Sequence, residues 1–192
     1  MASTLVLAVA ISAAIFWPGS GAKQVGSQSI ASAASGLASD EPTEDARAEI
    51  PPKYLALYRR FGREMDIDWR FLASIGGQES NHGRVPGTNL VNHAGCVGPM
   101  QIGVGGRCGN FLAAFGIDGN GDGRIEPRNP ADAIATAAWG LRAGKGAPAA
   151  SGRQVGSYYE AACGYYGACA DQWVNYADEV MERARRYGLR AS

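Results

Sequence analysis

The sequence predicts a mainly α-helical fold, on three observations. Apolar residues recur three and four positions apart in several stretches between Ile50 and Tyr187, which is the spacing of one helix face. No stretch shows the sustained alternation of apolar and polar residues that is typical of strands. The 27 glycines among 192 residues indicate tight turns. We therefore expect helices joined by Gly-rich loops, mostly within one domain.

The predicted helices follow one another along this part of the chain. The first begins after Pro51-Pro52, and Asp68 can cap the second. Asn129-Pro130 begins the third, because Asn is a favoured cap and Pro a favoured first residue. A fourth, between residues 154 and 163, is interrupted by a glycine, and the last ends at Gly188. The apolar positions that define the clearest faces are Tyr54, Leu57, Tyr58, Phe61, Met65, Leu72, Ile75, Ile134, Ala137, Ala138, Leu141, Trp173, Ala177, Val180, Ala184 and Tyr187.

The charge balance limits the class of partner. The chain has 18 Lys and Arg against 18 Asp and Glu, so its formal net charge is zero. Proteins that bind nucleic acids or anionic membrane surfaces normally have a surplus of positive charge. We therefore expect no nucleic-acid partner, and we expect the chain to act as a monomer.

The N-terminal segment differs in composition from the rest. Residues 5–17 form an apolar run, broken only by Ser12, that is short for a bilayer span of about 20 residues but suits a secretory signal. Small residues follow up to Ala22, and no positive charge precedes the run. Two interpretations stay open for residues 1–22: a signal peptide, or an N-terminal anchor that tethers the chain to a membrane through residues 4–17. Both predict an exported protein of the cell envelope or cell wall, or a secreted one.

A flexible linker is predicted between this segment and the folded domain. Residues 23–49 are rich in Gly, Ser and Ala and end in an acidic patch, so they have little to bury. The domain is then expected to span residues 50–192, which is long enough for one core.

Four cysteines lie in the predicted domain, at positions 96, 108, 163 and 169. The short loops favour the pairs Cys96–Cys108 and Cys163–Cys169, although four cysteines allow three pairings. A zinc site is a weaker interpretation, because no C-x2-C pair is present and the chain has two histidines. Free thiols would require a reducing compartment. We predict two disulfides.

Glu79 is a carboxylate in an unexpected place. It lies seven residues after Leu72 and four after Ile75, so it projects from the apolar face near the C-terminal end of its predicted helix. Burial and the negative helix end both disfavour ionisation and would raise the pKa of this carboxyl. A carboxylic acid that stays protonated near neutral pH suits general-acid catalysis. Taken alone, the position also fits an exposed Glu at a frayed helix end.

Further motifs follow Glu79-Ser80 in a fixed order. Gly98-Pro99-Met100-Gln101-Ile102 comes next, then Ala161-Ala162-Cys163-Gly164-Tyr165, and then Tyr176 and Val180 in a Tyr-x-x-x-Val pattern. In this order the motifs resemble those of the lytic transglycosylases that share the goose-type lysozyme fold. The resemblance implies a lysozyme-like helical domain with Gly-rich loops lining a glycan cleft.

The resemblance covers most of the predicted domain, from about Ile50 to Tyr187. The string from Ile75 to Arg84 looks closest to the branch typified by membrane-bound lytic transglycosylase B. Two features depart from the family pattern. Tyr166 stands where the family usually has Asn, and a Cys96–Cys108 disulfide would lie close to the cleft.

The resemblance also implies a reaction. Family members cleave the β-1,4 bond after N-acetylmuramic acid in peptidoglycan, without water, and leave a 1,6-anhydro ring. Glu79 would protonate the leaving oxygen and then accept the proton of the sugar's C6 hydroxyl. Ser80, Gln101 and Tyr165 would hydrogen-bond the substrate, and Met100 would pack against a sugar face. Met100 equally fits the core, and Tyr165 also fits a half-buried helix aromatic.

A second carboxylate near Glu79 would favour hydrolysis instead. Ordinary glycosidases place two carboxyls about 5–9.5 Å apart. Asp68 and Asp66 precede Glu79 by 11 and 13 residues, which is about 16–20 Å along a helix that rises ~1.5 Å per residue. Asp132 or Glu160 could fold closer. The alternatives to a transglycosylase are therefore a hydrolytic muramidase of the same fold or an inactive cell-wall-binding module.

A second candidate site is a calcium loop. Asp118, Asn120 and Asp122 stand at positions 1, 3 and 5 of an EF-hand-like sequence, with Gly at position 6. The Arg124 carbonyl could serve as position 7, and Asp132 or Glu126 could complete the shell, because Asn129 replaces the usual Glu at position 12. A Gly- and Asp-rich turn without metal is the alternative. Calcium would be structural, and catalysis needs no cofactor.

Overall fold

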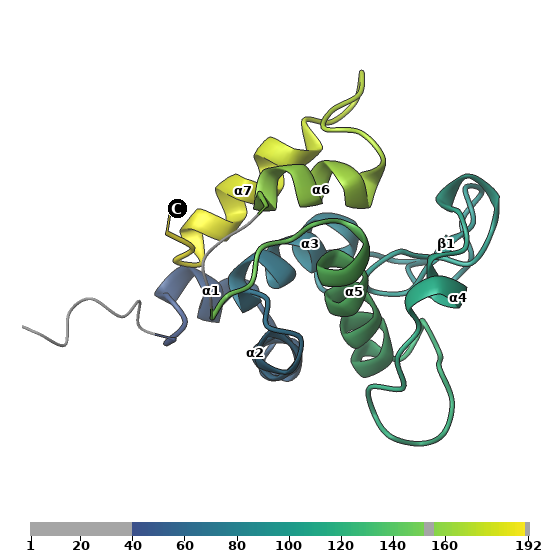
Figure 1. The fold of residues 1–192 in the computed structure, drawn as a ribbon, viewed down its shortest axis with the longest axis horizontal. Coiled ribbons are helices and arrows are strands. Elements are labelled where there is room, and N and C mark those ends of the chain that lie inside the picture. Colours follow the sequence, from purple (N-terminus) through teal and green to yellow (C-terminus); the bar gives the residue numbers. More distant parts are fainter. Residues whose placement is uncertain (1–39, 152–155, 191–192) are drawn as a thin grey trace, which may run out of the picture. The chain divides into compact units, whose positions relative to one another are not determined.

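Helix α3, Trp69–Ser80, is the central element of the fold. The computed structural model describes residues 40–151 and 156–190. Nine of the twelve α3 residues are buried, because helices α2, α5 and α7 pack around it (Figure 1). The mainly α-helical prediction is therefore confirmed. The elements are α1 Glu44–Glu49, α2 Pro52–Glu64, α3 Trp69–Ser80, β1 Cys96–Val97, β2 Ile102–Gly103, the 3-10 turn η2 Gly106–Cys108, α4 Phe111–Phe115, α5 Pro130–Gly144, α6 Tyr158–Tyr166 and α7 Tyr176–Arg186.

The helix starts follow the expected caps where those caps are local. The Asp68 side chain accepts a hydrogen bond from the Arg70 N–H at 2.8 Å, and Asn129 accepts one from the Ala131 N–H at 2.9 Å. Helix α6 begins only after the interrupting glycine, at the cap Ser157. These three helices therefore begin where a side-chain oxygen can satisfy a free backbone donor.

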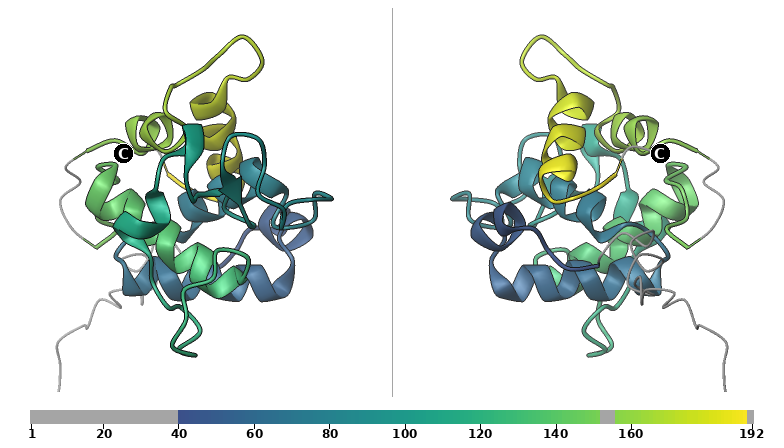
Figure 2. Two further views of the ribbon diagram at one scale, coloured as in Figure 1. Left: turned by 90° about the vertical axis from the view of Figure 1, so that its right-hand side faces the viewer. Right: turned by 90° about the vertical axis from the view of Figure 1, so that its left-hand side faces the viewer.

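Helix α7 begins three residues later than the apolar stripe predicts. The backbone N–H groups of Trp173 and Val174 donate to the Asp171 carboxylate at 2.7 and 3.0 Å, so they belong to a turn rather than to a helix. This turn lies in the connection between α6 and α7, which projects from the helices (Figures 1 and 2). The connection between α4 and α5 projects at the opposite end.

The folded part begins earlier than predicted, so the linker boundary at residue 49 is wrong. Helix α1 lies inside the predicted linker 23–49; Thr43 caps it, and its Ala46 is fully buried. Asp40 also accepts a hydrogen bond from the Trp69 indole at 2.9 Å. The buried side chain of Ala46 and the hydrogen bond between Asp40 and Trp69 attach this acidic segment to the core.

The predicted signal or anchor, residues 1–22, and the first part of the linker lie outside the described residues. Among residues 40–151 and 156–190, no helix has both the length and the apolar composition needed to cross a membrane.

A short antiparallel hairpin was not predicted from the sequence. Strands β1 and β2 pair Cys96 with Gly103 and Val97 with Ile102. Two residues per strand are too few to show an alternating pattern, which explains why the sequence did not reveal them. The predicted disulfides are confirmed: Cys96 is bonded to Cys108, and Cys163 to Cys169. The zinc and free-thiol interpretations are therefore wrong.

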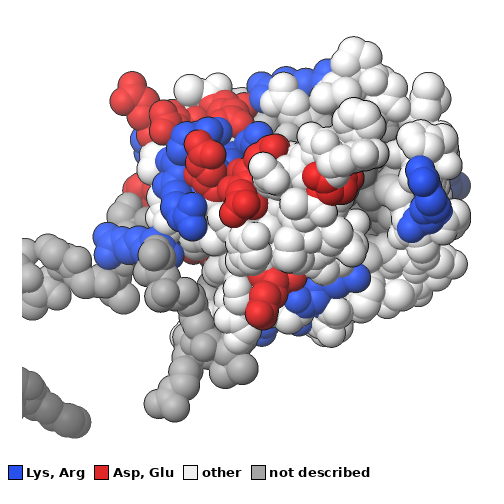
Figure 3. Space-filling model, turned by 90° about the horizontal axis from the view of Figure 1, so that it is seen from above, with Lys and Arg blue, Asp and Glu red and all other residues white. Residues whose placement is uncertain are grey.

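Charged side chains of both signs gather at the end of the molecule that carries α1 (Figure 3). Glu49 pairs there with Arg183 at 3.2 Å and with Arg186 at 3.1 Å, and Asp40 pairs with Arg59 at 3.0 Å. Toward the β1–β2 end, the same face has few charges. On this face, charges of opposite sign are therefore paired at the α1 end, whereas the β1–β2 end is sparsely charged.

Candidate active site

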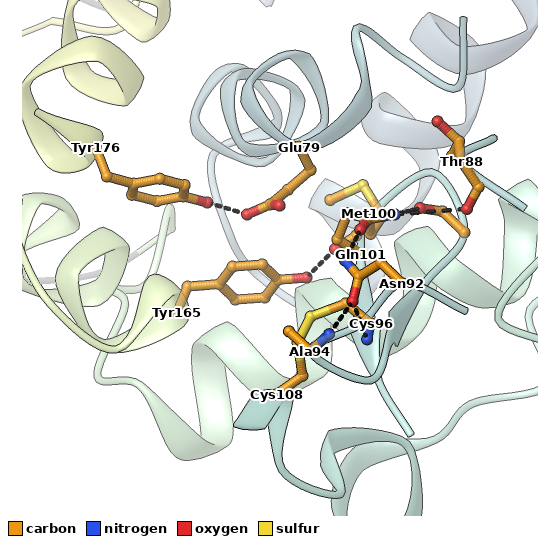
Figure 4. Close-up of a disulfide and its surroundings, with 11 residues drawn as sticks. Glu79, Thr88, Asn92, Ala94, Cys96, Met100, Gln101, Cys108, Tyr165 and Tyr176 are labelled. Atoms are coloured by element: carbon orange, nitrogen blue, oxygen red, sulfur yellow. Dashed lines mark hydrogen bonds between the residues drawn. A yellow bond between two sulfur atoms is a disulfide. The ribbon is translucent and has the colours of Figure 1, made fainter. Parts of the chain in front are cut away.

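A pocket of about 710 Å³ opens between the C-terminal end of α3, the β1–β2 hairpin and helix α6. Glu79 lines it from α3, Gln101 from the hairpin turn and Tyr165 from α6. The Cys96–Cys108 disulfide lines the same pocket, as the motif spacing predicted (Figure 4). Three residues predicted to act on a sugar are therefore brought together from segments far apart in the chain.

Glu79 lies in the last turn of α3, and the chain reverses immediately after it. Asn81 and His82 both have left-handed φ values, of 51° and 55°, which end the helix. The Ser80 hydroxyl donates to the Pro99 carbonyl at 2.6 Å and accepts from the Gly83 N–H at 2.7 Å. Ser80 therefore joins the end of α3 to the loop that carries Gln101.

These bonds also correct the predicted role of Ser80. Its side chain is buried, at 1% exposure, and does not line the pocket. Met100 is likewise fully buried, so of its two interpretations the core position is confirmed. Neither residue is placed to touch a bound sugar.

The pKa of Glu79 depends on its burial and on one hydrogen-bond partner. The Tyr176 hydroxyl donates a hydrogen bond to its carboxylate (Figure 4). Burial raises the pKa of Glu79 from 4.5 to about 7, and the bond from Tyr176 opposes part of that rise. The raised pKa predicted from the apolar helix face is thus confirmed. Near neutral pH, Glu79 can both donate and accept a proton.

Two further tyrosines extend this arrangement into the α6–α7 connection. The Tyr166 ring stacks on the Tyr176 ring, with centroids 4.5 Å apart and an interplanar angle of 11°. The Tyr166 hydroxyl donates to Asp171 at 2.6 Å. Tyr166, which stands where the resembling family usually has Asn, therefore supports the ring that bonds Glu79.

Gln101 and Tyr165 are held by the backbone around them. Gln101 has a left-handed φ of 46°, and its side-chain amide donates to the Gly98 carbonyl at 2.9 Å. Its side-chain oxygen accepts from Asn92 at 2.9 Å. The Tyr165 hydroxyl donates to the Met100 carbonyl at 2.8 Å (Figure 4). A left-handed non-glycine residue is uncommon and is found preferentially at functional sites.

Tyr176, which bonds Glu79, and several residues that line the pocket were not predicted as site residues. Tyr176 had a signal, its place in the Tyr-x-x-x-Val pattern, but no role was attached to it. The others come from loops or helix ends, and among them only Tyr166 had a signal, its place where the resembling family usually has Asn. They are Asn92, Arg107, Lys145, Tyr166 and Asp171.

Asp171 is the second carboxylate of the pocket. The acids considered from the sequence, Asp132 and Glu160, do not line it. Asp171 accepts hydrogen bonds from the Tyr166 hydroxyl and two backbone N–H groups, so both its oxygens are engaged. The bond from Tyr166 lowers the pKa of Asp171 most, followed by that from the Trp173 N–H. The two pocket acids are thus pushed in opposite directions, one toward the neutral and one toward the charged form.

The predicted calcium loop is closed by its own hydrogen bonds. Asp118 accepts from the N–H groups of Gly121 at 2.7 Å and Gly123 at 2.8 Å, and the Asn120 amide donates to Asp122 at 2.7 Å. Among the described residues, no group of three or more His, Cys, Asp or Glu is gathered around a metal position. The loop has oxygen donors of the kind that a hard cation prefers, but they are turned largely onto backbone N–H groups.

Asp132 has a different environment from the one predicted. It is 1% exposed, and its two oxygens accept backbone N–H groups of Gly119 at 2.9 Å, Asn120 at 3.1 Å and Glu126 at 2.9 Å. It therefore attaches both ends of the loop to the start of α5. This anchoring role does not require an ion.

No family model and no curated protein matches the sequence. Solved structures of similar fold do exist. The Escherichia coli lytic transglycosylase Slt35 in complex with bulgecin A is similar with a TM-score of 0.50 and 14% identity, over 74% of this chain and 76% of that chain. The same enzyme in complex with calcium is similar with a TM-score of 0.49 and 14% identity, over 74% and 77% of the two chains. The chain therefore has the lysozyme-like fold of a lytic transglycosylase.

Proposed function

We propose that the chain cleaves the β-1,4 bond between N-acetylmuramic acid and N-acetylglucosamine in peptidoglycan, without water. The observation that supports this best is Glu79, a pocket carboxyl whose pKa is raised to about 7 by burial. The fold of the chain and the order of its motifs agree with this chemistry. We extend the proposal to the branch typified by membrane-bound lytic transglycosylase B, on the sequence from Ile75 to Arg84.

In the proposed reaction one carboxyl serves twice. Protonated Glu79 gives its proton to the glycosidic oxygen as the bond from that oxygen to C1 of N-acetylmuramic acid breaks. The C6 hydroxyl of the same sugar then attacks C1, and the Glu79 carboxylate accepts the hydroxyl proton. The products are a 1,6-anhydro sugar and a strand with a free 4-hydroxyl. Tyr176 would hold the carboxylate between the two steps, because its bond favours the charged form.

Substrate contacts are proposed for Gln101 and Tyr165. Both line the pocket with Glu79, and their amide and hydroxyl groups suit sugar hydroxyls and N-acetyl groups. Their present bonds to backbone carbonyls hold them in position.

Hydrolysis is the second candidate, because Asp171 lines the same pocket. An ionised second carboxylate could activate a water molecule. We favour ring closure because both Asp171 oxygens are engaged by the Tyr166 hydroxyl and by backbone N–H groups.

The test is digestion of purified peptidoglycan by the wild type and by E79Q, with mass analysis of the products. E182Q, at an exposed Glu on α7, is the matched control. We expect 1,6-anhydro products from the wild type and the control and none from E79Q. Reducing-end products would instead establish hydrolysis. Undiminished cleavage by E79Q would refute the catalytic role of Glu79 and favour a module that only binds the wall.

We also propose that the chain is exported and acts as a monomer at the cell envelope or wall. Two disulfides support the export, because such bonds persist mainly in oxidising compartments. The membrane tether through residues 4–17 is part of this proposal and rests on the sequence alone.

A structural calcium ion on residues 118–124 remains a proposal. It rests on the spacing of Asp118, Asn120 and Asp122 and on the oxygen chemistry of these side chains. Asp132 would hold the loop through the backbone N–H groups of Gly119 and Glu126 rather than bind the metal.

A further inference from the structure

Two basic side chains line the pocket without a partner among the described residues. Most Lys and Arg residues of 40–151 and 156–190 have a carboxylate or a backbone carbonyl within bonding distance, for example Arg183 with Glu49 and Arg128 with Asn89. Within the described residues Lys145 and Arg107 have no such bond, and both line the pocket that contains Glu79. They come from different segments: Lys145 follows the end of α5, and Arg107 lies in η2.

The side chain of Lys145 packs against helix α6 at Gly164. A Cβ atom at Gly164 would lie 3.4 Å from Lys145 Cδ and 3.7 Å from its Cβ, so the aliphatic stem of Lys145 passes over the bare backbone of Gly164. Lys145 is half-buried in consequence. Burying the stem while the charged end reaches the pocket is the usual behaviour of a long basic side chain at an apolar surface.

The acids of the pocket do not neutralise these cations. Asp171 is bonded by the Tyr166 hydroxyl and by backbone N–H groups, and Glu79 by the Tyr176 hydroxyl. No ion pair joins either acid to Lys145 or Arg107 in the described part of the chain. The pocket therefore has positive charge available for a ligand, although the whole chain is neutral.

We propose that Lys145 and Arg107 bind a carboxylate carried by the substrate beside the scissile bond. This inference rests on the proposed function, which places N-acetylmuramic acid next to Glu79. That sugar bears a lactyl group on C3 of the ring whose C1 is attacked. The lactyl carboxyl is either free or joined to a stem peptide that has carboxylates of its own. A strand of N-acetylglucosamine alone has neither, so the two cations would select muramyl strands over chitin-like ones.

Binding to the full-length E79Q protein tests this without turnover. Its affinity is measured for peptide-free muramyl strands, for peptide-bearing strands and for neutral N-acetylglucosamine oligomers, with and without K145Q and R107Q. We expect the double substitution to lower the preference for the acidic strands about three- to tenfold, since loss of one exposed charge pair weakens binding by a small factor and loss of a partly desolvated pair by more. High salt should reduce the same preference in the E79Q protein that keeps Lys145 and Arg107.

The controls are K53Q and R63Q, at exposed basic residues on α2 that do not line the pocket. If the double variant loses affinity mainly for peptide-free strands, the bound group is the lactyl carboxylate; if mainly for peptide-bearing strands, it is a stem-peptide carboxylate. An unchanged preference, or an equal loss in the controls, would overturn the inference. Absence of any cleavage by the protein with Glu79 intact would instead refute the proposed function, so the two failures are distinguishable.

Discussion

Replacing Glu79 with glutamine should make the protein more stable at neutral pH while removing its activity. Burial holds the pKa of Glu79 at about 7 in the folded protein, against 4.5 for the free side chain. The folded state therefore binds the proton more tightly than the unfolded state does. The contribution of Glu79 to stability is therefore largest below about pH 4.5, falls as the pH rises toward 7, and is constant above that. The glutamine side chain cannot ionise, so E79Q should lack this fall.

The size of the effect follows from the pKa. A change from 4.5 to about 7 corresponds to about 3 kcal/mol, at about 1.4 kcal/mol for each factor of ten. Urea unfolding of the wild type and E79Q should give nearly equal free energies at pH 4. At pH 8 the variant should be more stable by up to about 3 kcal/mol. E182Q, at an exposed position, is the control and should show no such difference between the two pH values.

This reasoning would be refuted by a difference between E79Q and wild type that does not change with pH. That result would mean that the carboxyl is solvated in the folded protein, and the argument for a proton donor near neutral pH would fail with it. A variant less stable at pH 8 than at pH 4, relative to wild type, would show that the pocket stabilises the charged form.

Three further predictions concern the site and its supports. Y176F removes the hydroxyl that lowers the pKa of Glu79, so the alkaline limb of the pH–rate profile should move to higher pH. G76A should lower the free energy of unfolding by about 1–3 kcal/mol, because the new methyl group would collide with the Tyr58 hydroxyl under α3. Adding calcium at 100 times its dissociation constant to the chelated protein should raise the melting temperature by about 5 °C or more, if residues 118–124 bind it.

Each of these has a control and an opposing outcome. An alkaline limb that stays in place in Y176F would mean that this tyrosine does not tune the acid. G77A is the comparison for G76A: its methyl group would meet Cδ of the flexible Arg183 side chain at 2.8 Å, so it should cost less. An equal rise with magnesium, or no rise in melting temperature with calcium, would count against the calcium loop.

Local features of the sequence predicted the helices well. Helix caps and apolar spacing act within one or two turns, so they can be recognised without knowledge of the fold. Examples are the caps Asp68 and Asn129 and the apolar faces of α3 and α5. The same applies to the turn that delays α7, although its signal, Asp171 bonding two following N–H groups, was not recognised. Helix α1 was missed because its burial depends on a distant surface that accepts Ala46.

The active-site predictions also differ according to whether they depend on local spacing or on the tertiary structure. The position of Glu79 on an apolar helix face is a property of spacing, and it was sufficient to predict a carboxyl with a raised pKa. The roles assigned to Ser80 and Met100 required knowledge of which side of the loop faces the pocket. Both side chains face the interior, where Ser80 joins two backbone segments and Met100 fills the core.

What the sequence determined by itself is therefore the longer helices α2, α3, α5, α6 and α7, the acid at the end of α3 and the two disulfide pairs, because each depends on neighbours close in the chain. Only the tertiary structure decided the partners of that acid. Tyr176 is 97 residues from Glu79 along the chain, and the two meet because α7 packs against α3. Lys145 and Arg107 reach the same pocket for a similar reason. A hydrogen bond or a charge acts over a few ångströms in space, and packing alone places such distant residues within that range.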